Sequence, residues 1–113
     1  MNTPGAQHRL ATYGTLAPGQ ANADQLDGLK GTWQTGTVRG KLIEEGWGAD
    51  HGCPGLILGP EGQEVTVHLF TSTDLSEHWD RLDAFEGAEY RRTVTFVATE
   101  AGVVSAMIYE IVT

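Results

Sequence analysis

Residues 74–99, "DLSEHWDRLDAFEGAEYRRTVTFVAT", contain a helical pattern followed directly by a strand pattern. In the first half, four apolar residues recur at intervals of four, three and three: Leu75, Trp79, Leu82 and Phe85. This spacing places them on one face of a helix, so we predict a helix over residues 74–86. β-branched residues are frequent in the second half, which predicts a strand over residues 90–99. The two patterns together indicate an α+β domain.

The predicted helix carries signals at both ends. Asp74, with Glu77 three residues later, has the pattern of an N-cap and capping box. Gly87 can adopt the left-handed conformation that ends a helix. Glu86 directly precedes it, where a carboxylate meets the negative end of the helix dipole, and Asp83 lies one turn earlier. Both effects favour the protonated carboxyl, so we predict a raised pKa for Glu86.

The position of Glu86 has two interpretations. A carboxyl group whose pKa approaches neutrality is suited to taking up and returning protons in a reaction. Alternatively, Glu86 is a solvated carboxylate that tolerates a small energetic penalty, or one that is paired with Arg91 or Arg92. The helix pattern alone does not choose between these interpretations.

The rest of the chain contains short strand patterns separated by glycine-rich turns. We predict strands over residues 9–13, 37–45, 55–59, 64–72 and 103–112, and loops over residues 17–31 and 46–54. A chain of 113 residues fits one domain, residues 1–113. These elements predict a β-dominated α+β domain, either a curved sheet or a small barrel with one main helix.

Composition limits the classes of partner. The net charge is −8 and the seven basic residues are scattered, so we expect neither nucleic acid nor an anionic membrane as a partner. A hydrophobic content of 40% predicts a folded core. No apolar run is long enough for a signal peptide or a membrane span, and Cys53 is the single cysteine. We therefore expect a reduced, cytoplasmic setting.

Few residues have the spacing of a catalytic or ligand site. The histidines lie far apart and Cys53 has no base beside it, so we expect neither a metal site nor a thiol nucleophile. The stretch "YGTL", residues 13–16, is different, because Gly14 lets the backbone bend and present successive N–H groups. Such a turn can bind a carboxylate or an oxyanion. The alternative is that Gly14 only makes a turn.

Several short motifs occur together in an order that resembles a known family. They are "YGTLAPGQANADQL" (13–26), "GKL" (40–42), "PGLI" (54–57), "VTVHLF" (65–70), "LDAFEGAEYRR" (82–92) and "SAMIYE" (105–110). The sequence resembles the gamma-glutamylcyclotransferase-like superfamily and is most similar to its short branch, which includes gamma-glutamylamine cyclotransferase. The combination of "YGTL" with "LDxFEGxxYxR" about seventy residues later is the specific mark.

The resemblance implies a small mixed-strand β-barrel with flanking helices and a reaction that needs no cofactor. The free α-amine of a small-molecule γ-glutamyl substrate attacks its own γ-carbonyl, and 5-oxoproline and an amine or amino acid are formed. By the same resemblance, Glu86 is the catalytic acid/base. Tyr13, Gly14, Thr15 and Leu16 form the loop that holds the glutamyl group, and Tyr90 and Tyr109 lie near the cavity.

The sequence departs from the family in two places and leaves alternatives open. Ala17-Pro18 follows "YGTL" where a basic residue is common, and the glycine-rich loop over residues 46–55 is longer than expected. The leaving group and the oligomeric state stay open. The alternatives to an enzyme are a non-catalytic small-molecule-binding or regulatory domain and a domain for protein contact. Trp33 and Trp47 would then form an exposed aromatic patch rather than cover the barrel ends.

Overall fold

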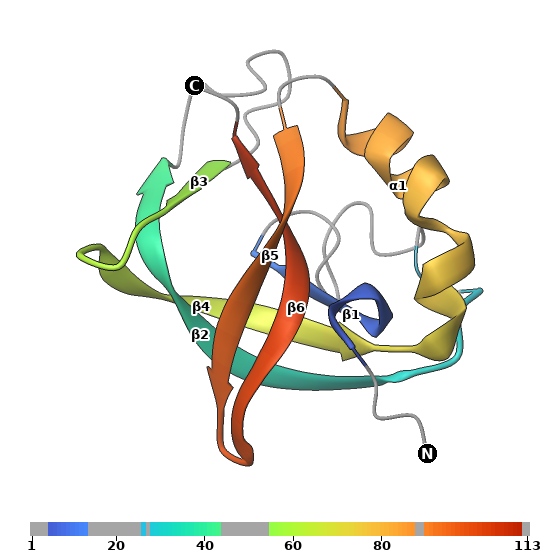
Figure 1. Ribbon diagram of the computed structural model, residues 1–113, viewed down its shortest axis with the longest axis horizontal. Coiled ribbons are helices and arrows are strands. Elements are labelled where there is room, and N and C mark those ends of the chain that lie inside the picture. Colours follow the sequence, from blue (N-terminus) through green and yellow to red (C-terminus); the bar gives the residue numbers. More distant parts are fainter. Residues whose placement is uncertain (1–4, 14–25, 27, 44–54, 88–89, 112–113) are drawn as a thin grey trace.

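The computed structural model of the protein describes residues 5–13, 26, 28–43, 55–87 and 90–111. Most of the predicted loop over residues 17–31 and all of that over residues 46–54 lie outside the described residues. The strands are β1 (Arg9–Thr12), β2 (Thr32–Ile43), β3 (Gly55–Leu58), β4 (Gln63–Thr71), β5 (Tyr90–Thr99) and β6 (Gly102–Ile111). Figure 1 shows the strands wrapped around a common centre, with one helix beside them.

Strand β2 begins five residues before the predicted start of residue 37, at Thr32. Its first part pairs with β4 in continuous register, with Trp33 opposite Phe70. Residues 32–35 are exposed, so this part of the strand has no alternation of buried and solvent-facing residues. The sequence signal for a strand depends on that alternation, which explains why the prediction began too late. The other predicted strands agree with the structure to within a residue or two at each end.

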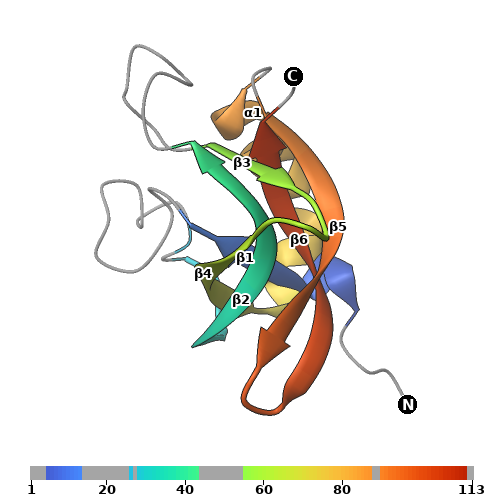
Figure 2. The same cartoon turned by 90° about the vertical axis from the view of Figure 1, so that its left-hand side faces the viewer.

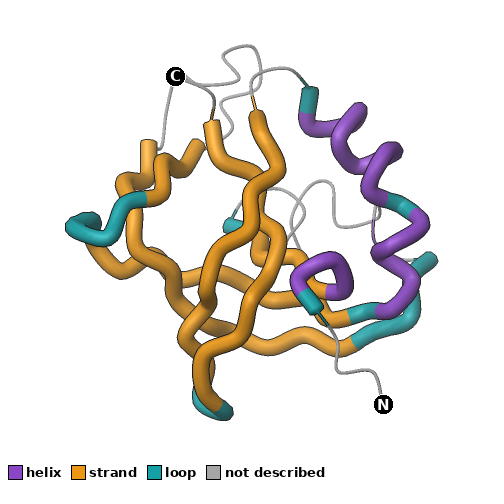
Figure 3. The backbone as a smooth tube through the Cα atoms, viewed as in Figure 1, coloured by secondary structure: helices purple, strands orange, loops and turns teal. Residues whose placement is uncertain are grey.

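The sheet closes on itself. Its strand order is β3-β2-β4-β1-β6-β5, and β5 pairs again with β2 through Thr37 and Ala98. Strands β2, β4, β1, β6 and β5 therefore form a ring, and β3 pairs with the last four residues of β2, Gly40 to Ile43. The pairing of β1 with β6 is parallel and the other pairings are antiparallel. The predicted mixed-strand β-barrel is confirmed (Figure 3).

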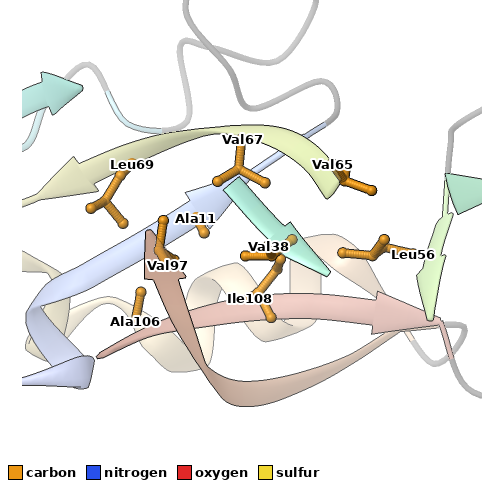
Figure 4. Packing of buried hydrophobic residues seen from close by; sticks show 9 residues of the cluster. All are labelled: Ala11, Val38, Leu56, Val65, Val67, Leu69, Val97, Ala106 and Ile108. Atoms are coloured by element: carbon orange, nitrogen blue, oxygen red, sulfur yellow. The ribbon is translucent and has the colours of Figure 1, made fainter. Parts of the chain in front are cut away.

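Two groups of buried apolar residues hold the domain together. The first fills the barrel: Ala11, Val38, Leu56, Val65, Val67, Leu69, Val97, Ala106 and Ile108, whose side chains face one another in Figure 4. The second lies between the barrel and the helix: Leu10, Leu26, Phe70, Leu75, Trp79, Leu82 and Tyr109. Neighbouring residues on one strand, such as Leu10 and Ala11, belong to different groups because successive side chains point to opposite faces.

The helical segments flank the barrel and differ from the prediction at the N-terminal end. A 3₁₀ segment, η1 (Ala6–His8), precedes β1, and a second, η4 (Thr73–Glu77), precedes the helix α1 (Trp79–Glu86). The N-cap of η4 is Ser72, whose side chain accepts a hydrogen bond from the amide of Asp74. The N-cap of α1 is His78. The prediction of Asp74 as N-cap was wrong. Its carboxylate instead accepts a hydrogen bond from the amide of Lys30, at 3.0 Å.

The predicted apolar face of the helix is correct for three of its four residues. Leu75, Trp79 and Leu82 are buried, but the side chain of Phe85 is 38% exposed. Trp33 is also 38% exposed and packs on Phe70, with 4.8 Å between the ring centroids. Trp47 lies outside the described residues. No helix in the described part of the chain has the length and apolarity needed to span a membrane.

Closure of the barrel depends on a glycine where β2 crosses β5. A Cβ at Gly36 would lie 2.5 Å from a methyl group of Val97 and 2.8 Å from the carbonyl oxygen of Ala98. Real Cβ contacts are longer, so either strand would have to move. Gly36 therefore lets β2 and β5 approach closely enough to pair at Thr37 and Ala98.

We expect Gly36→Ala to destabilise the fold by about 1–3 kcal/mol, as overpacking does elsewhere in protein cores. Chemical denaturation followed by circular dichroism measures this. Gly59→Ala is the matched control, because nothing lies within 4 Å of a Cβ at Gly59. Equal stability of the two variants would contradict this role of Gly36.

Candidate active site

Glu86 occupies the end of the buried face of α1. It lies four residues after the buried Leu82 and seven after the buried Trp79, so its side chain continues their stripe toward the barrel. The residue is half-buried, and burial raises its pKa to about 7. The predicted direction of this shift is confirmed. The raised pKa is caused by the loss of hydration on burial. The sequence had indicated other causes, the helix dipole and repulsion by Asp83.

Gly87 ends the helix, as predicted. Its φ angle is +86° and its ψ angle is −177°, which is an extended conformation with positive φ that glycine adopts without strain, rather than the predicted left-handed helical one. The amide of Gly87 donates to the carbonyl oxygen of Asp83 at 3.1 Å. The chain therefore leaves α1 directly after Glu86 and reaches β5 at Tyr90.

Tyr13 lies just beyond the end of β1, and its hydroxyl group is engaged within the protein. It donates to the carbonyl oxygen of Tyr109 at 2.5 Å and accepts a hydrogen bond from the amide of Leu56 at 3.1 Å. Burial raises the pKa of Tyr13, and the nearby Tyr90 and Glu86 raise it further. Tyr13 therefore lies within electrostatic reach of Tyr90 and of Glu86.

Tyr109 connects this end of the barrel to the helix. Its hydroxyl donates to Oδ1 of Asp83 at 2.7 Å. Burial raises the pKa of Tyr109, the hydrogen bond to Asp83 adds to the shift, and the charge of Glu86 contributes as well. Glu86 thus lies within electrostatic reach of two phenols, one at the end of β1 and one on β6.

Glu110, next to Tyr109 on β6, is a buried carboxylate with three hydrogen bonds. Oε1 accepts from the guanidinium of Arg91 and from the hydroxyl of Thr93, each at 3.0 Å. Oε2 accepts from the amide of Leu58 at 3.1 Å. Burial alone would raise the pKa of Glu110, but these hydrogen bonds outweigh it, so that its pKa lies below the ordinary value.

Side chains accept the hydrogen bonds of β3 on its edge away from β2: those of Tyr13 and Glu110. The amide of Gly59 donates to the carbonyl of Arg39 on β2, at 3.2 Å. Because backbone groups alternate in direction along an antiparallel strand, the amides of Leu56 and Leu58 point away from β2. These two amides donate to the side chains of Tyr13 and Glu110. β3 is thereby held beside the end of β6 without a backbone ladder (Figure 2).

An open pocket of about 510 Å³ lies next to this group. It is lined by Asp83, Ala84, Gly87, Tyr90, Arg92 and Tyr109. Of the predicted site residues, Tyr90 and Tyr109 line this pocket, whereas Tyr13 and Glu86 are not among its lining residues. Tyr13 is hydrogen-bonded to Tyr109, and the charge of Glu86 raises the pKa of both phenols. The other three, Gly14, Thr15 and Leu16, lie outside the described residues. Among the described residues, no three His, Cys, Asp or Glu side chains are placed to hold a metal ion.

Three polar residues of this end were not predicted as part of the site: Asp83, Arg92 and Glu110. Arg92 pairs with Asp83 at 3.4 Å and Arg91 pairs with Glu110 at 3.0 Å, so both arginines that were considered as partners of Glu86 pair with other carboxylates. A sequence signal for Glu110 was available, because it follows Ala106 and Ile108 at the two-residue spacing of the side chains that face the barrel interior. A buried acidic residue needs hydrogen-bond partners.

Comparison with known proteins identifies the family. The family model described as "Gamma-glutamyl cyclotransferase, AIG2-like" matches residues 10–113. The chain belongs to this family. The resemblance inferred from the sequence motifs is therefore confirmed. No curated protein sequence matches the chain.

Solved structures agree on the fold. An AIG2-like protein from Mus musculus has a TM-score of 0.74 and 24% identity, over 91% of this chain and 76% of that one. YkqA from Bacillus subtilis has a TM-score of 0.71 and 24% identity, over 92% of this chain and 35% of YkqA. The chain thus spans about a third of the length of YkqA. An uncharacterized protein from Pyrococcus horikoshii has a TM-score of 0.61 and 22% identity, over 91% and 76%. At these identities the likeness shows the fold.

Burial of Glu86 predicts a pH-dependent cost to stability. The folded pKa, about 7, lies above the ordinary value of 4.5. The folded state therefore keeps the proton more firmly, and stability decreases as pH rises from 4.5 through 7. We expect Glu86→Gln to be more stable than the wild type at pH 8 by about 1–3 kcal/mol, and this advantage to disappear near pH 4. Denaturation at both pH values measures it.

Glu77→Gln is the control, because it makes the same change at an exposed position of η4. We expect it to alter stability little at either pH. A Glu86→Gln advantage of equal size at pH 4 and pH 8 would show that the carboxyl group is not shifted by burial.

Proposed function

We propose that the protein is a gamma-glutamyl cyclotransferase that releases 5-oxoproline from a small γ-glutamyl substrate. The observation that carries this proposal is the position of Glu86, a half-buried carboxyl beside two phenols with a pKa of about 7. A general base works best when its pKa lies near the working pH. Membership of the family supports the reaction type.

In the proposed reaction the Glu86 carboxylate takes a proton from the α-ammonium group of the substrate. The neutral amine nitrogen then attacks the γ-carbonyl carbon and forms the C–N bond of a five-membered lactam. The attacking nitrogen loses a second proton as the bond from that carbon to the leaving nitrogen breaks. The leaving nitrogen takes up both protons, the first of them from Glu86, and departs as an ammonium group. The products are 5-oxoproline and an amine or amino acid. The balance requires neither water nor an oxidant or reductant.

In this proposal, orientation of the substrate adds to the rate acceleration that proton transfer by Glu86 provides. A free γ-glutamyl chain has several rotatable bonds, so its amine and carbonyl seldom meet in a reactive arrangement. By the family resemblance, the N–H groups of the loop Gly14–Leu16 hold the substrate carboxylate. Fixing both reacting atoms removes that freedom before the chemical step.

We assign Tyr13 and Tyr109 to the frame of the site. Each phenol already donates its proton within the protein, Tyr13 to the backbone of Tyr109 and Tyr109 to Asp83. Neither has a further O–H to donate to a substrate. Their proposed role is to hold this end of the barrel in place next to Glu86, whose charge acts on both phenols. Tyr90 lines the pocket together with Tyr109.

Incubation of the purified protein with a panel of γ-glutamyl amines and γ-glutamyl peptides, followed by an assay for 5-oxoproline, tests the proposal. We expect product from at least one compound. kcat/KM should rise with pH through about 7 as Glu86 loses its proton. Glu86→Gln should lower kcat by about 10²–10⁴-fold, the usual contribution of a general acid–base group.

Glu77→Gln again serves as the matched control and should retain activity. Undiminished turnover in Glu86→Gln would exclude the proposed role. A wild type that binds γ-glutamyl compounds, by calorimetry, without forming 5-oxoproline would instead indicate the non-catalytic binding or regulatory domain.

A further inference from the structure

We propose that Asp83 is a positioning residue that holds the last turn of α1, and with it Glu86, against the barrel. The proposal rests on the proposed function in so far as Glu86 is the catalytic group. Asp83 itself touches neither substrate nor reacting atoms in this account. It acts through its hydrogen bond to Tyr109 and its ion pair with Arg92.

The last turn of α1 needs such a contact because apolar packing ends before it. Leu82 is the last fully buried side chain of the helix, and Phe85 is 38% exposed. α1 has eight residues and Glu86 is the final one. Short helices and helix ends open easily when tertiary contacts do not hold them. Without a further contact, the carboxyl of Glu86 would move between the protein and water.

Asp83 supplies contacts to two strands of the barrel. On β6, the phenol of Tyr109 donates to Oδ1 at 2.7 Å. On β5, Nε of Arg92 lies 3.4 Å from the same oxygen. The side chains of Asp83 and Arg92 are 41% and 25% exposed, so the ion pair alone contributes little. The short hydrogen bond from a buried phenol to a carboxylate is the stronger of the two.

The partners of Asp83 are themselves fixed. The guanidinium carbon of Arg92 lies 4.7 Å from the ring centroid of Trp79, at the first turn of α1. The backbone carbonyl of Tyr109 accepts the hydroxyl of Tyr13. Arg92 thus contacts α1 at its first turn and its last, and Tyr109 is held from the opposite side. Asp83 joins the end of the helix to a rigid frame.

The titratable groups near the end of α1 decide how the proposal is tested. Tyr13, beyond β1, and Tyr109, on β6, interact electrostatically with Glu86. Tyr90 and Arg92 on β5, together with Asp83 on the helix itself, line the pocket at this end of the barrel. Removing Asp83 would expose Glu86 and would also remove a nearby negative charge. Both changes lower the pKa of Glu86. A variant that frees the helix end without changing charge is therefore needed, and Tyr109→Phe is that variant.

The test is a titration of the Glu86 carboxyl by carbon-13 NMR in the full-length protein, with Glu86→Gln used to assign the signal. We expect the pKa, about 7 in the wild type, to fall toward the ordinary value in both Asp83→Ala and Tyr109→Phe. Asp83→Asn keeps an oxygen that can accept from Tyr109, so its pKa should lie between those of Asp83→Ala and the wild type.

Asp80→Asn is the matched control, since it removes an exposed acid from the first turn of the same helix. It should leave the pKa of Glu86 unchanged. An unchanged value in Tyr109→Phe would overturn the proposal, because a fall in Asp83→Ala would then be an effect of charge alone. If Asp83→Ala does not fold, Tyr109→Phe decides by itself.

The titration needs no turnover, so it separates this proposal from the proposed function. If the wild type has no cyclotransferase activity, the proposed function is wrong. A fall in the pKa of Glu86 in Asp83→Ala and Tyr109→Phe would still establish the positioning role. Where turnover is present, we expect kcat to fall about 10–100-fold in Asp83→Ala and Tyr109→Phe, as a misplaced catalytic group does. Asp80→Asn should keep the wild-type kcat. Unchanged kcat in both test variants would contradict the link to catalysis.

Discussion

The hydroxyl of Tyr13 joins two strands of the barrel wall that share no backbone ladder. It donates to β6 through the carbonyl of Tyr109 and accepts from β3 through the amide of Leu56. A buried amide or hydroxyl without a partner costs about 1–3 kcal/mol, so each of these groups needs the others. In the sequence, Tyr13 directly precedes the "GTL" residues. The carboxylate of Glu110 likewise accepts a hydrogen bond from the amide of Leu58 on β3.

This end of the barrel therefore uses most of its polar groups on the fold. Tyr109 and Arg92 contact Asp83, while Arg91 and Thr93 contact Glu110. Glu86 differs from these carboxylates, because burial sets its pKa and raises it to about 7. A half-buried carboxyl with a pKa of about 7, near side chains that are held by hydrogen bonds, is suited to proton transfer. The cost of burying that carboxyl is met by the packing of Trp79 and Leu82 on the same helix face.

Much of the fold follows from local signals in the sequence. Alternation placed Val65, Val67 and Leu69 on the inner face of β4. The helix ends at Gly87, as predicted, with a positive φ angle that only glycine adopts freely. The start of β2 was missed because its first residues are exposed and carry no alternation. Barrel closure, by contrast, depends on the close approach of β2 and β5 at Gly36. The sequence contains fifteen glycines, and nothing local marks Gly36 as the one at which two strands meet.

The site was predictable in its residue types and less so in its contacts. After Leu82 the next residue on the buried face can lie three or four positions later, and the apolar Phe85 was the natural choice. The structure places Glu86 there instead, and the burial that raises its pKa follows from that choice. The contacts of Asp83 and Glu110 join residues 26 and 52 positions apart, to Tyr109 and Leu58 respectively. No local pattern encodes such pairings.

A crystal structure of the protein with 5-oxoproline bound tests the account most directly. We predict that the lactam nitrogen lies about 3 Å from a carboxyl oxygen of Glu86, the distance that proton transfer requires. The carboxylate of 5-oxoproline should meet the N–H groups of the segment Gly14–Leu16, and the hydroxyl of Tyr13 should keep its bonds to Tyr109 and Leu56. A lactam bound elsewhere, or one bound here with the Glu86 carboxyl turned to solvent, would contradict the account.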